Sequence, residues 1–257
     1  MFTSNPFADL TVFLSPLVMQ VYIVLMILAV AGGTLFDMLH KSSAKFFARQ
    51  WKKSKAAAER PLSGMDTASI AARTLLKEIA TSGEFRNPKR RISHLLMFYG
   101  FLLYLTTTIV MVFGYPTQSA PAPVVLPILW NIGALMVLIG GYWFFFFLRV
   151  NVAHEGHSPF RLMRADLFIV TLLASVTFAF IWEIVQTAGN LTAIKIAFGL
   201  YIFFTTLLFV SVPWSKFAHM FYKPVVAFQR RVEEADGSSS LPTPTTPRGE
   251  RCPHSHT

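Results

Sequence analysis

Five long apolar runs dominate the 257-residue chain and restrict what it can fold into. They cover residues 13–39, 93–114, 124–148, 167–187 and 194–213. About 20 apolar residues in a helix cross a hydrocarbon core of roughly 30 Å, so each run is long enough to span a bilayer. Charged residues make up only 14% of the chain, against about a quarter in soluble domains. We therefore predict an all-α integral membrane protein with five transmembrane helices.

The first run lies where a signal peptide would, but its flanks do not fit one. The preceding residues, MFTSNPFADL, contain an acidic residue and neither Lys nor Arg, and no small-residue cleavage site follows the run. We therefore expect this run to be retained as the first transmembrane helix.

The basic residues are concentrated between alternate runs. Thirteen Lys and Arg lie from Lys41 to Arg91, three follow the third run and six follow the fifth, whereas the opposite loops hold only Lys195. Because Lys and Arg accumulate in cytoplasmic loops, we predict an external N-terminus and a cytoplasmic C-terminus. The same bias accounts for the net charge of +10, so nucleic-acid binding, for which no motif is present, is disfavoured.

The chain divides into two predicted parts. Residues 1–228 form a five-helix membrane domain that includes a cytoplasmic loop over 41–92, and residues 229–257 form a disordered cytoplasmic tail whose Ser, Thr and Pro leave nothing to bury. Within the loop, the composition of Asp66–Ile79 predicts a surface helix with an acidic start. Its apolar residues suit either the membrane interface or a partner protein.

Ionisable residues lie near the ends of the runs and leave the middle of the bilayer free of charge. A charge at the bilayer centre costs on the order of 3 kcal/mol or more, so ion pumps and proton-coupled carriers keep a few such residues for their function. The chain therefore does not resemble such a transporter. Its single cysteine, Cys252, excludes an iron–sulfur cluster or a disulfide within the chain.

Two histidines stand inside helix-like sequence, His94 at the start of the second run and His219 at the predicted end of the fifth. Because these runs cross the membrane in opposite directions, the two imidazoles are expected at the same depth. Two imidazoles on facing helices are what a six-coordinate haem b needs. Four basic residues are within reach of its propionates by sequence: Arg90, Arg91, Lys216 and Lys223. The alternative is that both histidines are only amphipathic residues at the headgroup level.

The topology and these histidine motifs resemble the gamma subunit of respiratory nitrate reductase. The segments that carry the resemblance are HLLMFYGF at 94–101, the three Thr at 106–108 and PWSKFAHMFYKP at 213–224. The relatives of that subunit include the membrane subunits of heterodisulfide reductases and of the quinone-interacting oxidoreductase complex of sulfate metabolism. A short, cysteine-free chain looks most like the membrane anchor of dissimilatory adenylylsulfate reductase. The resemblance covers roughly residues 13–228 and implies a place in a respiratory chain of the bacterial inner membrane.

The family pattern has two haems between the second and fifth spans, and this chain matches only one pair of ligands. His94 and His219 match the ligands of the haem nearest the cytoplasm. Tyr104, ten residues after His94, and Tyr201, eighteen before His219, stand where the second pair would be. The departure implies a single haem b, with Tyr201 packed against the partner helix where the second haem would fit.

The resemblance implies an electron-transfer subunit rather than a complete enzyme. Its haem would pass electrons between membrane quinone and a cytoplasmic iron–sulfur or flavin oxidoreductase, such as adenylylsulfate reductase in sulfur oxidation, which docks on the basic face and catalyses the main reaction. The competing interpretation is a haem-free membrane anchor for a cytoplasmic enzyme complex. A small-solute carrier is disfavoured, since no polar cluster lies at the midplane.

Two groups of polar residues are candidates for the quinone site. The group predicted near the cytoplasm comprises Asp37, His40, Arg164 and Asp166. The group predicted near the outer surface comprises Asn131, Glu183 and Gln186, although Glu183 is also placed to pair with Lys195. We favour the cytoplasmic group, because electrons must reach the only haem.

Overall fold

Five helices of the computed structural model, within the residues it describes, are long and apolar enough to cross a membrane. Those residues are 2–40, 43–60, 62–74, 76, 80–81, 87–149, 160, 162–163, 166–212 and 219–239, and the side chains at 38–39, 43–47 and 219–223 are excepted. The spanning helices are α1 (Pro16–His40), α4 (Pro88–Gly114), α5 (Val125–Trp143) with its π-helical continuation η3 (Phe144–Leu148), α7 (Leu167–Ala188) and α8 (Leu191–Val210). The described chain contains no strand. The predicted all-α architecture with five spans is confirmed.

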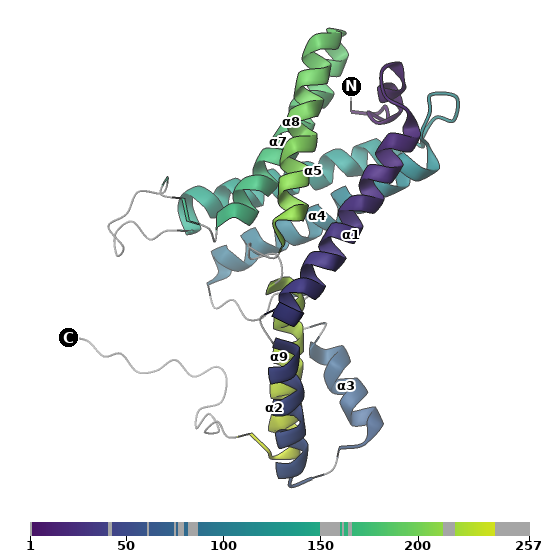
Figure 1. Cartoon of the computed structure of the whole chain (residues 1–257). Coiled ribbons are helices and arrows are strands. Elements are labelled where there is room, and N and C mark those ends of the chain that lie inside the picture. The colour runs from purple at the N-terminus through teal and green to yellow at the C-terminus, as the bar shows by residue number, and fades with distance from the viewer. Residues whose placement is uncertain are drawn as a thin grey trace, which may run out of the picture.

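The elements outside the spans lie at the two ends of the bundle (Figure 1). The short 3-10 helix η1 (Ala8–Val12) lies at one end, which we name the η1 end. Helices α2 (Ser43–Ala57), α3 (Gly64–Thr74) and α9 (His219–Asp236) lie at the opposite end. We name this the basic end, because the segments there hold most of the Lys and Arg.

Helices α4 and α5 approach each other backbone to backbone. A Cβ added at Gly100 would stand 2.8 Å from the Gly133 carbonyl oxygen, and one added at Gly133 would stand 2.7 Å from the Tyr104 backbone nitrogen. A Cβ at Gly140 would likewise stand 2.8 Å from the Ser93 carbonyl oxygen, and the Ser93 hydroxyl donates to the Gly140 carbonyl at 2.8 Å. Small residues allow such close packing in membranes, where van der Waals contact between helices is a main source of stability.

Helices α7 and α8 form a second antiparallel pair, joined at the η1 end by a tight turn. Gly189 has a φ of 72°, the left-handed conformation that glycine adopts without strain and that often ends helices. The next residue, Asn190, begins α8 by accepting the Ala193 amide at 3.1 Å on its side chain. Within the pair, the hydroxyls of Ser175 and Thr205 are 2.7 Å apart. Helix α5 packs on α7, and α1 packs on α4 and α8.

Part of the predicted surface helix over Asp66–Ile79 is confirmed as α3. Its start is a capping box, in which the Ser63 hydroxyl accepts the Asp66 amide at 3.1 Å and Asp66 Oδ2 accepts the Ser63 amide at 3.2 Å. Helix α3 packs on α9, where an Arg231 guanidinium nitrogen lies 3.3 Å from the Thr74 hydroxyl. Its partner is thus the C-terminal part of the same chain, a third possibility that the sequence did not suggest.

The predicted boundary between domain and tail at residue 229 lies inside a helix. Helix α9 continues to Asp236, supported by side-chain contacts one turn apart: Gln229 Nε2 donates to Glu233 at 3.0 Å, and Arg230 Nε donates to Glu234 at 2.9 Å. The Glu59 amide also donates to the Asp236 carbonyl at 2.9 Å, which joins the end of α9 to the segment after α2. The rest of the predicted tail, residues 240–257, lies outside the described residues.

The substitution Gly133→Ala is expected to separate α4 from α5, because its methyl group would meet the backbone of Tyr104. Overpacking of this kind typically costs about 1–3 kcal/mol, so the midpoint of thermal unfolding in detergent should fall by several degrees. The matched control is Gly199→Ala on α8, where a Cβ meets nothing within 4 Å and stability should hold or rise. Equal melting of the two variants would contradict the proposed close contact.

Candidate functional site

His94 lies on the face of α4 that is turned toward α8. Its ring stacks on Phe98, with centroids 6.4 Å apart and planes 6° apart. His94, Phe98 and Phe101 share one helix face, since they are four and three residues apart. Phe101 contacts Phe209 of α8, with ring centroids 6.5 Å apart. The neighbouring face of α4, with Ser93 and Gly100, packs against α5.

His219 is not at the end of the fifth span, as the sequence predicted, but is the first residue of α9. Helix α8 ends at Val210, three residues before the predicted end of that span. The segment 213–218 and the side chain of His219 lie outside the described residues. The expected equal depth of the two imidazoles therefore stays a prediction.

Two of the four basic residues predicted to hold propionates are described, and both lie on the first turn of α4. Arg90 donates from Nη2 to the Leu148 carbonyl at 3.0 Å, and Arg91 donates from Nε to the Thr81 carbonyl at 2.8 Å. Arg90 stands one turn before His94 and thus on the same helix face. Lys216 and the side chain of Lys223 lie outside the described residues.

Three of the four residues of the cytoplasmic quinone group are described, and they lie on two different elements. Asp166 forms an ion pair with Arg149 and accepts the Met163 amide at 2.9 Å, so it ties the start of α7 to the end of η3. Asp37 is buried, with 2% of its surface exposed, and the exposed His40 ring stacks on Phe36 at 5.3 Å. These two residues are three apart on α1 and share a face. The fourth member, Arg164, lies outside the described residues.

Two residues of the outer group meet, and the third does not join them. The Asn131 amide donates from Nδ2 to Glu183 Oε1 at 3.0 Å, and both side chains are buried between α5 and α7. Gln186 instead donates from Nε2 to the Pro6 carbonyl at 3.0 Å. Lys195 does not pair with Glu183, since its ammonium lies over the Phe13 ring at 5.6 Å.

Buried aromatic rings fill the η1 end, at the level where the resemblance would place a second haem. Tyr104 stacks on Trp130 with centroids 5.1 Å apart, and Tyr201 stacks on Trp182 at 5.8 Å. Phe7 contacts both indoles, at 5.9 Å and 5.4 Å. Tyr201 is buried as predicted, with its ring stacked on Trp182 of α7 and its hydroxyl in contact with the Tyr104 hydroxyl of α4. The residues here therefore do not fit a second haem.

The N-terminal segment closes this end of the bundle, which sequence reasoning missed. Asn5 donates from Nδ2 to the Tyr115 carbonyl at 2.8 Å, and Gln118 donates to Asp9 at 2.9 Å. These bonds hold Phe7 and Leu10, with 4% and 2% of their surfaces exposed, against the spanning helices. The sequence contained a signal for this contact, because Phe7 and Leu10 are large apolar residues that precede the first run. An N-terminus that extended freely into water would leave both exposed.

The same end of the bundle contains buried polar atoms without a hydrogen-bond partner among the described residues. They are Trp182 Nε1, Asn131 Oδ1 and Glu183 Oε2. Unsatisfied polar groups are costly in an apolar interior, so the one bond that joins Asn131 to Glu183 matters for stability.

The substitution Asn131→Leu removes the amide group that donates a hydrogen bond to Glu183 Oε1. It should destabilise the protein by about 1–3 kcal/mol, which would be measured as a lower midpoint of thermal unfolding in detergent. Glu183→Gln keeps a carbonyl oxygen for the Asn131 amide and should stay close to wild type. The double variant Asn131→Leu/Glu183→Leu should recover part of the loss, because no polar group is left unpaired. An Asn131→Leu variant as stable as wild type would show that the bond contributes nothing.

The chain matches no family model, no curated protein and no solved structure. Among the described residues, no three His, Cys, Asp or Glu side chains gather as a metal-binding group would. A function must therefore be argued from the chain's own residues.

Proposed function

We propose that this protein is an electron-transfer subunit of the bacterial inner membrane, with one haem b held by His94 and His219. The haem exchanges single electrons with membrane quinone and with a cytoplasmic iron–sulfur or flavin oxidoreductase. A respiratory chain that oxidises sulfur compounds, with adenylylsulfate reductase as partner, is the setting that the sequence resemblance favours.

One ring contact between α4 and α8 is the observation that carries this proposal. Phe101 of α4 contacts Phe209 of α8, and the two helices run in opposite directions. Residues before Phe101 and residues after Phe209 therefore approach the basic end together. His94 lies seven residues before Phe101 and His219 ten residues after Phe209. This register directs His94 toward the basic end, the same end at which α9 begins with His219.

The side chains that could bind a haem iron differ between the basic end and the η1 end. For the basic end the sequence offers His94 and His219, and imidazole is a strong axial ligand for haem iron. At the η1 end, the equivalent residues are the phenols of Tyr104 and Tyr201, whose rings are already stacked on indoles. The chain thus fits one haem b and not two.

The chain's own residues have distinct roles in this proposal. When bound, the haem supplies reversible one-electron transfer. His94 holds the iron from α4, and its stacking on Phe98 fixes the direction of the imidazole ring. Arg90, on the same helix face, is placed to balance the charge of a propionate. The contact of α4 with α5 leaves only the α8 side of α4 open to such a group.

The quinone site is assigned to the basic end, beside Asp37 and His40. The structure supports this choice over the outer group, because Asn131 and Glu183 bond each other beneath the closed η1 end. His40 is exposed, and an imidazole can both donate and accept a proton, so it is suited to exchange one with a quinone oxygen. Asp166 is left out, because its partner is Arg149.

A reduced-minus-oxidised absorption spectrum of the purified protein tests the haem. Wild type should show a b-type signal of one haem per chain, and both His94→Ala and His219→Ala should lose it, since each removes an axial ligand. His40→Ala is the control, because it should keep the spectrum and slow only reduction by added quinol.

The same spectrum decides against the proposal if it shows no haem in a well-folded wild type. The protein would then be a haem-free membrane anchor for a cytoplasmic enzyme complex. Two haems per chain would contradict the aromatic filling of the η1 end.

The orientation of the chain is proposed from its basic residues, with the basic end in the cytoplasm. Cysteine labelling in intact cells with a membrane-impermeant maleimide tests it, because Cys252 is the only natural cysteine. Cys252 should be labelled only after lysis. The exposed Ser119 lies between α4 and α5, and Ser119→Cys in a Cys252→Ser background should be labelled in intact cells. The reverse pattern would invert the topology.

A further inference from the structure

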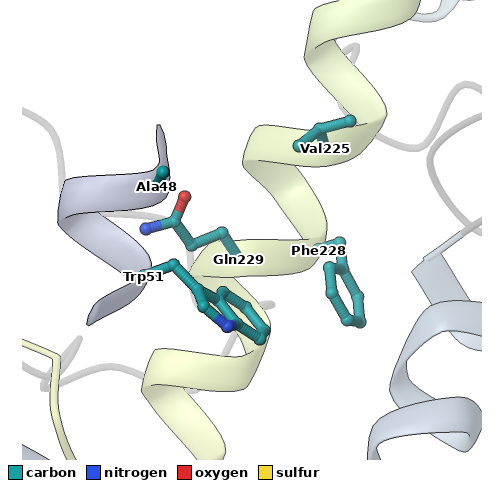
Figure 2. A pocket seen from close by; sticks show the side chains of 5 residues that line it. All are labelled: Ala48, Trp51, Val225, Phe228 and Gln229. Carbon is teal, nitrogen blue, oxygen red and sulfur yellow. The ribbon is translucent and has the colours of Figure 1, made fainter. Parts of the chain in front are cut away.

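An apolar groove of about 300 Å³ lies between α2 and α9 at the basic end. Figure 2 shows its lining, with Ala48 and Trp51 from α2 and Val225, Phe228 and Gln229 from α9. The Trp51 and Phe228 rings stack with centroids 6.0 Å apart. Val225 is 49% exposed and its neighbour Val226 is 47% exposed. The groove therefore offers open apolar surface to an incoming side chain.

Positive charge lies along the α2 side of this groove. Helix α2 has five basic residues and no acidic one: Lys45, Arg49, Lys52, Lys53 and Lys55. The last four have described side chains, and all four residues are exposed. The Lys55 ammonium lies over the Trp51 ring at 5.6 Å, at the edge of the groove. An apolar slot beside a cationic helix is complementary to an acidic segment that carries one apolar side chain.

The distance from the spanning helices favours a protein over a lipid as the occupant. The membrane-spanning part of α1 ends at Asp37, and Trp51 is fourteen residues further along the chain. The helical residues 38–40 and 43–51 alone rise by about 18 Å along their axes, whereas the headgroup region of one leaflet is only about 5–8 Å thick. Figure 1 shows α2 leading away from the spanning helices. The groove thus lies beyond the headgroups, in water.

The protein itself does not supply a suitable segment. Residues 240–257 contain Arg248 and Arg251 against the single acidic Glu250, so their charge has the same sign as that of α2. A symmetric contact between two copies would set one basic α2 against another. Both arrangements place like charges together, which costs free energy.

We infer that the groove between α2 and α9 is the docking site for an acidic segment of a cytoplasmic partner protein, which inserts an apolar side chain beside Trp51 and Phe228. The inference rests on the proposed function in taking this partner to be a subunit of the oxidoreductase. The cations of α2 speed the encounter, and the buried apolar side chain slows dissociation.

Photo-crosslinking in native membranes tests the site, with the full chain carrying p-benzoylphenylalanine at Val225. The expected product is one protein adduct, with the crosslinked peptide of the partner net negative and apolar at the point of attachment. The same probe at Met65, which is 82% exposed on α3 outside the groove, should not give this adduct. Both labelled chains should reach wild-type levels and elute as single species in detergent.

Charge reversal supplies the matched comparison. Lys52→Glu/Lys53→Glu should lower the yield of the adduct at least fivefold. Arg60→Glu/Lys89→Glu makes the same change in net charge at exposed positions outside the groove and should leave the yield unchanged. Adducts with lipid, with a second copy or with residues 240–257 would overturn the inference. So would a partner peptide without net negative charge, equal yields from the two charge variants, or no adduct.

The test separates docking from haem binding. In His94→Ala membranes the adduct at Val225 should persist, because the groove contains no haem ligand. The adduct together with a wild type that binds no haem would overturn the proposed electron transfer and leave the docking site in place. A normal haem spectrum without the adduct would overturn the docking site alone.

Discussion

The close contact between α4 and α5 determines which side of α4 is available for function. Gly100 and Gly133 let the two backbones approach until no Cβ fits between them, and the Ser93 hydroxyl adds a bond to Gly140. This contact closes one face of α4 completely. His94, Phe98 and Phe101 lie on another face, which therefore turns toward α8. A change at a glycine far from any candidate ligand would thus disturb the candidate haem site.

The two ends of the bundle satisfy different physical demands. At the η1 end, the stacked indoles and phenols and the N-terminal segment close the bundle with apolar surface, and Asn131 meets Glu183 within it. At the basic end, charged groups are paired where they leave the bilayer, as Arg149 is with Asp166. Chemistry that needs both membrane quinone and a water-soluble partner is therefore better placed at the basic end.

The helices outside the bundle form an assembly of their own rather than a coat on the membrane surface. Helix α3 packs on α9, and Trp51 of α2 stacks on Phe228 of α9. These contacts join residues that are far apart in sequence, so the long loop after α1 and the end of the chain support each other. The assembly carries the most basic helix, α2, away from the spanning helices. In the proposed function, this helix would hold the partner near the haem.

The amino-acid sequence by itself determined the five spans and the placement of charge, because bilayer thickness sets the length of an apolar helix and burial of charge is costly. It also identified His94, Asn131 and Glu183 as residues of interest. Only the tertiary structure decided that Asn131 donates a hydrogen bond to Glu183, that Asp166 forms an ion pair with Arg149, and that α8 ends before His219. The filling of the η1 end by Phe7 and the packing of α3 on α9 were also decided there. Periodicity and hydropathy report what one helix needs, whereas these features depend on which side chains of different helices meet.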